Sequence, residues 1–181
     1  MNRGRWQVKR SKEIYRDEFV QLNVDEVVRP DGKDGTYATV NLKPGVAILA
    51  IDDTGEIYLT KQHRYAIDKE SVEVVSGGVD DGEEPLAAAK KELKEEIGIE
   101  AKDWRSLGAI NMDTSVIFCP LHLYVAKSLT ETGTEQEGTE DIKFFKVKLD
   151  RAVEMVQQGE ITHSASCCLI LKTALEGAAL S

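Results

Sequence analysis

The sequence contains few cysteines, no long apolar run and few aromatic residues. Its three cysteines, Cys119, Cys167 and Cys168, form no C-x-x-C pair, and their odd number argues against a disulfide framework. We therefore expect a reducing, cytoplasmic location. The longest apolar run, Val46 to Ile51, is too short to span a bilayer, and the basic N-terminus lacks the apolar stretch of a secretion signal. We expect no membrane partner.

Basic residues are also in the minority. The 181 residues include 23 Lys and Arg against 32 Asp and Glu, which gives a net charge of −9. This balance opposes nucleic-acid binding through phosphate neutralisation, so we expect no nucleic-acid partner. The chain also shows no internal repeat and no Walker A or Rossmann spacing. An anionic substrate would then have to be bound by local hydrogen-bond donors and a metal ion.

Residues 77–99, GGVDDGEEPLAAAKKELKEEIGI, join a glycine-rich turn to an amphipathic helix. Apolar residues at helical spacing predict a buried stripe, and Glu92, Glu95 and Glu96 lie beside it. Glu92 and Glu96 are one turn apart, a like-charge spacing that costs roughly 0.2–0.5 kcal/mol. A hard cation would offset this repulsion, because Mg²⁺ prefers carboxylate and phosphate oxygens. The stripe consists of Leu86, Ala89, Leu93 and Ile97.

The ends of this helix also carry local signals. Asp81 and Glu84 have the spacing of a capping box, and Pro85 suits the first helical position. Gly98 is expected to end the helix. Before it, Gly77 allows the backbone to approach a ligand closely.

The whole stretch resembles the Nudix box: Gly, five residues, Glu, seven residues, then Arg-Glu-apolar-any-Glu-Glu-any-Gly-apolar. Only Lys91 departs from this pattern, because the usual residue there is Arg. Lys keeps the positive charge but lacks the bidentate fork of the guanidinium. The resemblance implies an α/β fold, namely an α/β/α sandwich with a mixed sheet. The matching positions are Gly77, Glu83, Lys91, Glu92, Leu93, Glu95, Glu96, Gly98 and Ile99.

Strand-like alternation precedes the box and adds an N-terminal antiparallel sheet to the predicted fold. Residues 19–25 and 37–42 alternate apolar with polar side chains, and residues 46–51 suit a central strand that turns at 52–55 into a hairpin. We divide the chain into residues 1–45, an N-terminal arm with antiparallel strands, and residues 46–181, the Nudix hydrolase domain. Residues 128–141 are expected to form a loop.

Residues 1–12 gather five basic residues around Trp6. Three interpretations remain open: a solvated arm, an arm packed on a partner subunit, and an arm that stacks Trp6 on a nucleobase. In the ADP-ribose subgroup of Nudix enzymes, which this chain resembles, such N-terminal strands are generally exchanged between subunits. The resemblance therefore implies a homodimer with residues 1–45 at its interface.

The same resemblance supplies candidate site residues. Gln62-His63-Arg64-Tyr65 is similar to the Gln-Tyr-Arg segment of the subgroup, so Arg64 is a candidate for bidentate phosphate contact. Glu73 matches the acidic residue before the subgroup's Pro-Ala-Gly, and the Ser76 carbonyl is an implied metal ligand. Together with Trp6, Arg64 and Glu73 make up the predicted substrate contacts. The predicted ligands of Mg²⁺, with Mn²⁺ as a substitute, are Ser76, Glu92, Glu95 and Glu96.

The resemblance implies Mg²⁺-dependent hydrolysis of ADP-ribose to AMP and ribose 5-phosphate, or of a related nucleoside diphosphate sugar. The subgroup draws its general base from a loop before a late strand, which indicates Glu140, with Glu137 in reserve and Glu95 of the box third. Residues 112–115 lack the subgroup's usual Pro-Gly element. Alternatives are a nucleoside triphosphate or dinucleoside polyphosphate pyrophosphohydrolase, a non-catalytic nucleotide-sugar sensor, and a carboxylate-rich surface helix of an interaction protein.

Overall fold

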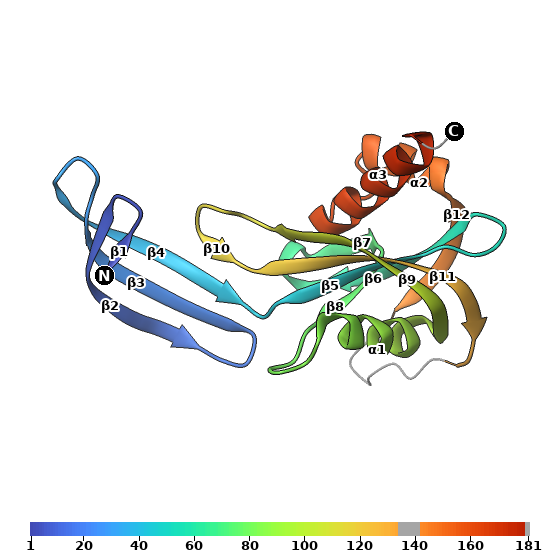
Figure 1. Cartoon of the computed structure of the whole chain (residues 1–181), viewed down its shortest axis with the longest axis horizontal. Coiled ribbons are helices and arrows are strands. Elements are labelled where there is room, and N and C mark those ends of the chain that lie inside the picture. Colours follow the sequence, from blue (N-terminus) through green and yellow to red (C-terminus); the bar gives the residue numbers. More distant parts are fainter. Residues whose placement is uncertain (134–141, 180–181) are drawn as a thin grey trace. The chain divides into compact units, whose positions relative to one another are not determined.

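A computed structural model describes residues 1–133 and 142–179, which form two compact units (Figure 1). The first unit comprises Met1–Lys43 and Asn111–Pro120, and the second comprises Pro44–Ile110 and Leu121–Ser181. Over the described ranges, none of the helices has both the length and the apolar character needed to cross a membrane.

The first unit is a five-stranded sheet in the order β1-β2-β3-β4-β10. β2, β3 and β4 form an antiparallel meander, and β10 joins β4 in parallel, with Ile117 opposite Val40. The antiparallel sheet expected before Val46 is therefore present, with one later strand added. The bounds are β1 Asn2–Arg3, β2 Trp6–Arg16, β3 Val20–Val28, β4 Asp34–Leu42 and β10 Ile117–Phe118.

Most side chains of residues 1–12 are exposed to solvent, but their backbone forms the regular strands β1 and β2 and not a loose arm. Trp6–Arg16 is a strand whose residues pair with β3 from Gln7 opposite Val28 to Arg16 opposite Gln21. Nearly all its side chains are exposed, so hydrophobic burial does not hold it in place. Backbone hydrogen bonds to β3 hold the strand in place, because each backbone N–H and C=O that leaves water must find a partner.

The second unit contains a four-stranded sheet, β8-β5-β11-β9, and a three-stranded sheet, β12-β6-β7. β5 runs parallel to β11 and antiparallel to β8, so the four-stranded sheet is mixed, as predicted. All residues of β5 are buried. The bounds are β5 Gly45–Ala50, β6 Glu56–Arg64, β7 Lys69–Glu73, β8 Val75–Gly78, β9 Ile99–Asn111, β11 Pro120–Glu131 and β12 Lys143–Lys148.

Helices lie on both sides of these strands, with α1 on one side and α2 and α3 on the other (Figure 1). The predicted α/β/α sandwich is confirmed. The stripe of α1 packs on β5 and β8 in a core that includes Leu93, Val46 and Val75. Burial of one such leucine stabilises the fold by about 1.5–3 kcal/mol. The bounds are α1 Pro85–Ile97, α2 Leu149–Gln157 and α3 Ser164–Ala179, and the 3₁₀ turn η1 covers Tyr65–Ile67.

Three local predictions are wrong. Asp81 does not cap α1: its N-cap is Glu84, which makes no side-chain capping hydrogen bond. The turn at residues 52–55 is present, closed by the Asp52 N–H donating to the Glu56 carbonyl at 2.9 Å, but beyond a bridge between Ile51 and Ile57 β5 and β6 form no hairpin ladder in the described part of the chain, and each pairs with other strands. β11 continues to Glu131, beyond the expected start of the loop at residue 128.

Candidate functional site

The backbone of Gly77 approaches the carboxylate of Glu92 closely. β8 packs on α1, and a Cβ atom built on Gly77 would lie 1.9 Å from Cδ and 2.1 Å from Oε1 of Glu92. No side chain other than hydrogen fits there with Glu92 in this position. The turn therefore fixes one carboxylate of the predicted metal set directly against the backbone.

The other predicted ligands flank this contact in the sequence. Glu96 is 3% exposed, one helical turn beyond Glu92, and Glu95 and Ser76 are half-buried. Carboxylates and a carbonyl are oxygen donors, the set that suits Mg²⁺, so the residue types fit a divalent cation. However, no group of three or more His, Cys, Asp or Glu side chains among the described residues is arranged to hold a metal ion. The assignments of Ser76, Glu92, Glu95 and Glu96 as ligands remain predictions.

Lys91, the one departure from the box pattern, is exposed at the start of the second half of α1. Its Nζ atom lies 3.9 Å from Oδ2 of Asp80, and both side chains are at least half exposed. An exposed pair of this kind contributes little stability, about 0–1 kcal/mol. Lys91 therefore gives only weak support to the turn before the helix.

Arg64 and Glu73 meet as a bidentate pair at the hairpin of β6 and β7. Nε of Arg64 donates to Oε1 of Glu73 at 3.0 Å, and Nη2 donates to Oε2 at 2.5 Å. The Glu73 side chain is only 4% exposed, whereas that of Arg64 is 38% exposed. Burial disfavours the Glu73 anion, but the hydrogen bond from Arg64 and the charge of His163 outweigh it and hold the pKa of Glu73 below its ordinary value. Ionised Glu73 thus holds the Arg64 guanidinium through two hydrogen bonds. Both residues remain predicted substrate contacts.

Two residues of the α3 region complete this cluster, and the sequence did not indicate them. His163 Nδ1 lies 3.5 Å from Oε2 of Glu73 and 2.9 Å from Oγ of Ser166. Ser166 is fully buried, and its Oγ accepts a hydrogen bond of 3.0 Å from the backbone N–H of Val74. Burial lowers the pKa of His163, against the opposing attraction of Glu73. No spacing in the sequence links these positions, because Val74 and Ser166 lie 92 residues apart.

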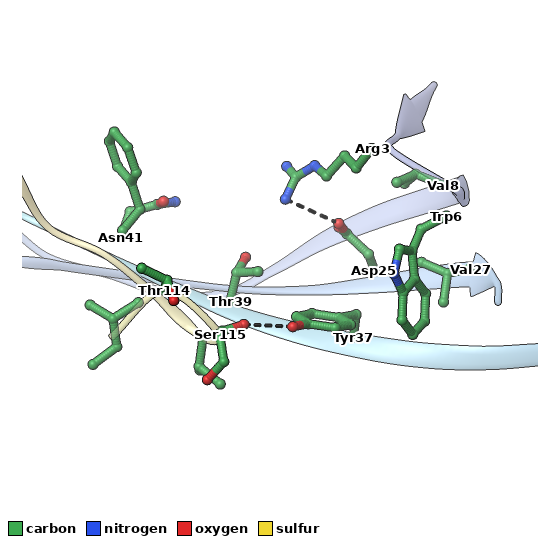
Figure 2. A pocket seen from close by; sticks show the side chains of 13 residues that line it. Arg3, Trp6, Val8, Asp25, Val27, Tyr37, Thr39, Asn41, Thr114 and Ser115 are labelled. Atoms are coloured by element: carbon green, nitrogen blue, oxygen red, sulfur yellow. Dashed lines mark hydrogen bonds and ion pairs between the residues drawn. The ribbon is translucent and has the colours of Figure 1, made fainter. Parts of the chain in front are cut away.

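Trp6 lines a cavity of about 500 Å³ within the first unit (Figure 2). Its ring meets that of Tyr37 edge to face, with centroids 5.2 Å apart, and the Tyr37 hydroxyl donates to the Ser115 carbonyl at 2.5 Å. Asp25 also faces this cavity although it is only 3% exposed. Its Oδ2 lies 3.8 Å from Nη1 of Arg3, and its Oδ1 has no hydrogen-bond partner within residues 1–133 and 142–179.

The cavity therefore combines aromatic faces with a buried carboxylate. The sequence indicated Trp6 but not Asp25, because alternation along β3 assigned Asp25 to the polar face. The predicted general bases Glu140 and Glu137 lie outside the described residues. They remain predictions, as does Glu95 in that role.

Comparisons with known proteins agree with this architecture. They place the chain in a class of hydrolases that generally use divalent metals, usually Mg²⁺. Residues 41–163 match the NUDIX domain, and residues 6–40 match the nucleoside diphosphate sugar hydrolase N-terminal domain. The chain belongs to the Nudix family. The family predicted from the box is confirmed.

Two of the relatives match along most of their length. A methanol dehydrogenase activator of Bacillus methanolicus is 31% identical over 159 residues, which cover 86% of this chain and 85% of the relative. An ADP-ribose pyrophosphatase of Bacillus subtilis (strain 168) is 29% identical over 171 residues, covering 91% and 92%. The crystal structure of an ADP compounds hydrolase has a TM-score of 0.81 and covers 98% of both chains at 17% identity, which supports the fold.

Proposed function

We propose that the protein is a Mg²⁺-dependent pyrophosphohydrolase of nucleoside diphosphate sugars, with ADP-ribose as the first candidate substrate and AMP and ribose 5-phosphate as products. The observation that carries the reaction type is the close approach of the Glu92 carboxylate, in the second half of an oxygen-donor helix, to the backbone of Gly77. The match of residues 6–40 to a nucleoside diphosphate sugar hydrolase domain supports the substrate class. Water attacks one phosphorus of the diphosphate, and the other phosphate leaves.

The predicted site residues divide into metal ligands and phosphate contacts in this proposal. Ser76, Glu92, Glu95 and Glu96 would hold Mg²⁺, with Mn²⁺ as a substitute. The ion would polarise phosphoryl oxygens and lower the pKa of water. Arg64 binds a phosphate oxygen while Glu73 fixes the plane of its guanidinium through two of its five N–H donors.

Proton removal from the attacking water needs a carboxylate that is not committed to the cation. Glu140 is proposed for this role, with Glu137 in reserve; Glu95 comes third, and only if it does not hold the cation. Loss of a general base typically lowers the rate by about 10²–10⁴. The three glutamates can therefore be separated by their effects on kcat.

Trp6 is proposed to stack on the nucleobase. The cavity beside it offers the aromatic face of Tyr37 and the buried carboxylate of Asp25, an acceptor for an exocyclic amine. Loss of one base–aromatic stack costs about 1–3 kcal/mol. We expect Trp6→Ala to raise KM roughly 5- to 150-fold while kcat stays near wild type, and Trp6→Phe to restore most of the affinity. An unchanged KM for Trp6→Ala would remove Trp6 from the site.

A substrate panel tests the function as a whole. The panel consists of ADP-ribose, GDP-mannose, UDP-glucose, diadenosine polyphosphates and nucleoside triphosphates, each with Mg²⁺, Mn²⁺ or chelator, and products are separated by chromatography. We expect ADP-ribose to give the highest kcat/KM and the chelator to abolish turnover. A preference for triphosphates or dinucleoside polyphosphates would assign the alternative hydrolase. Binding of a nucleotide sugar without turnover would assign a sensor.

We also propose a homodimer formed through the N-terminal strands. Large apolar side chains of the first unit are exposed, including Ile14 at 50%, Phe19 at 58% and Phe118 at 62%. Such side chains commonly mark a protein interface when they gather on one surface. Light scattering should give a dimer mass that Phe19→Glu reduces to a monomer mass. Ile67→Glu, at an apolar residue of the second unit with 51% exposure, is the matched control. A wild-type monomer mass at micromolar concentration would contradict the proposal.

A further inference from the structure

The first turn of α3 is tied to the Arg64–Glu73 pair by two contacts. His163 precedes the helix, and its carbonyl accepts the first helical hydrogen bond, from the Cys167 N–H at 2.9 Å. Its ring approaches Glu73 on the carboxylate oxygen that also accepts from Nη2 of Arg64. Ser166 then binds the backbone N–H that directly follows Glu73. The same turn therefore holds both the carboxylate and the backbone that carries it.

A carboxylate buried to this extent needs donors on more than one side. Arg64 supplies two, and the Glu73 side chain also receives a hydrogen bond from Ser71. Without a contact from α3, Oε2 would face the buried side of the helix with a single strong donor. Leaving a buried charged oxygen poorly satisfied is costly, so the group would move and take the guanidinium with it.

The tautomer of His163 decides whether its ring supports the carboxylate. If Nδ1 carries the proton, the N–H points into the space between Ser166 Oγ at 2.9 Å and Glu73 Oε2 at 3.5 Å. If Nε2 carries it, Nδ1 can accept the Ser166 hydroxyl hydrogen at 2.9 Å, but its lone pair then also faces the anionic oxygen of Glu73. Electrostatics favours the first arrangement, because a donor then faces the charge.

We propose that His163, in its Nδ1–H tautomer and supported by Ser166, is a positioning residue that orients Glu73 and through it the phosphate-binding guanidinium of Arg64. The inference rests on the proposed function in one respect, the phosphate contact of Arg64. It adds α3, which lies far from the Nudix box in sequence, to the machinery that prepares the substrate site. His163 itself does not touch substrate.

Kinetics on ADP-ribose with Mg²⁺ test the role. His163→Ala and His163→Gln should raise KM about 10-fold with kcat changed less than about 2-fold, since only the orientation of a binding group is lost. His163→Asn should stay near wild type, because the Asn amide nitrogen takes the place of Nδ1 whereas that of Gln takes the place of Nε2. An equal KM for the Asn and Gln variants would overturn the assignment.

A helix-cap role alone would also make the alanine variant less stable, so a double-mutant cycle separates the two. In an Arg64→Lys background, His163→Ala should have less than about 2-fold further effect on KM, since it acts only through the Arg64 fork. An additive 10-fold effect would identify a merely structural residue. His63→Ala is the matched control, because His63 Nε2 also lies 3.5 Å from a carboxylate, that of Asp68, but both groups are exposed.

Nitrogen-15 NMR of the substrate-free protein gives a readout that does not depend on turnover. At pH 8 the His163 ring should show a protonated Nδ1. The Arg64 Nε–H should exchange with solvent at least about 5-fold faster in His163→Ala than in wild type or His63→Ala. A protonated Nε2 or an unchanged exchange rate overturns the inference even if no substrate of the panel is hydrolysed. Failure of the panel with the expected spectra would instead reject the proposed substrate.

Discussion

Substitution of Gly77 by alanine should separate activity from stability. The new Cβ would lie 1.9 Å from Cδ of Glu92, and an ordinary contact starts near 3.4 Å, so the carboxylate must withdraw by about 1.5 Å. The backbone of Gly77 lies outside the left-handed region, so alanine adds no backbone strain there. The clash falls on the far end of a flexible type of side chain. We therefore expect a stability loss below about 2 kcal/mol.

The effect on catalysis should be much larger. Misplacement of a catalytic group by about 1 Å commonly costs about 10²-fold, so kcat/KM should fall by this order while the melting temperature changes by only a few degrees. Gly177→Ala is the control, because a Cβ atom on this glycine of α3 meets nothing within 4 Å. Activity should be measured at saturating Mg²⁺ alongside thermal melts.

A double mutant identifies Glu92 as the group that moves. In a Glu92→Gln background, Gly77→Ala should reduce the residual kcat/KM by less than about 3-fold, because the two changes act on one carboxylate. A further 10²-fold loss in that background would show that Gly77 acts through something else. Near-wild-type activity of Gly77→Ala itself would refute the contact as a functional one.

Three further predictions address other groups. Glu96→Gln should lose at least about 10² in kcat yet keep its melting temperature without metal, and wild-type turnover at saturating Mg²⁺ would rule Glu96 out as a ligand. Glu140→Gln should lower kcat by about 10²–10⁴ with KM nearly unchanged, whereas a loss confined to Glu137→Gln would move the base there. The pKa of His163 is lowered by burial, and that of Glu73 is lowered because its hydrogen bond from Arg64 and nearby charge outweigh burial. In both cases the unfolded chain binds the proton first as pH falls. The contribution of these two groups to the free energy of unfolding should thus be complete above about pH 6.5. It should decrease below that pH, first through His163 and then, below about pH 4.5, through Glu73. His163→Asn should remove the first of these two decreases in melts recorded from pH 8 to 4, and an unchanged pH profile would contradict this.

Helix α1 and the central strand could be predicted because their signals are local. Leu93 and Ile97 are buried at helical spacing, Pro85 begins the helix, and Gly98 ends it with a φ of 66°. The continuous apolar run of β5 is buried throughout. In these segments the apolar side chains are the buried ones, so the hydrophobic pattern of the sequence matches the burial in the fold.

β2 and Asp25 could not be predicted for the opposite reason. β2 is almost wholly exposed, so hydrophobic periodicity carries no information about a strand that the backbone ladder holds. Asp25 alternates with apolar neighbours as a solvent-facing residue would, yet it is buried beside Arg3. The contact of Val74 with Ser166 joins distant segments through one hydroxyl group. Such tertiary contacts leave no periodic signal.

The parallel addition of β10 to β4 affects how this chain can be divided. The chain passes between the two units after Lys43, after Ile110 and after Pro120, and β4 is the sole neighbour of β10 in its sheet as described for residues 1–133 and 142–179. A deletion of the chain up to Lys43 would therefore remove β4 and leave β10 without its partner strand in the middle of the remaining chain. A chimaera that exchanges the N-terminal region with a relative has to carry two separate gene segments, residues 1–43 and 111–120. In this chain the N-terminal sheet is thus coupled to a stretch inside the segment that matches the NUDIX domain.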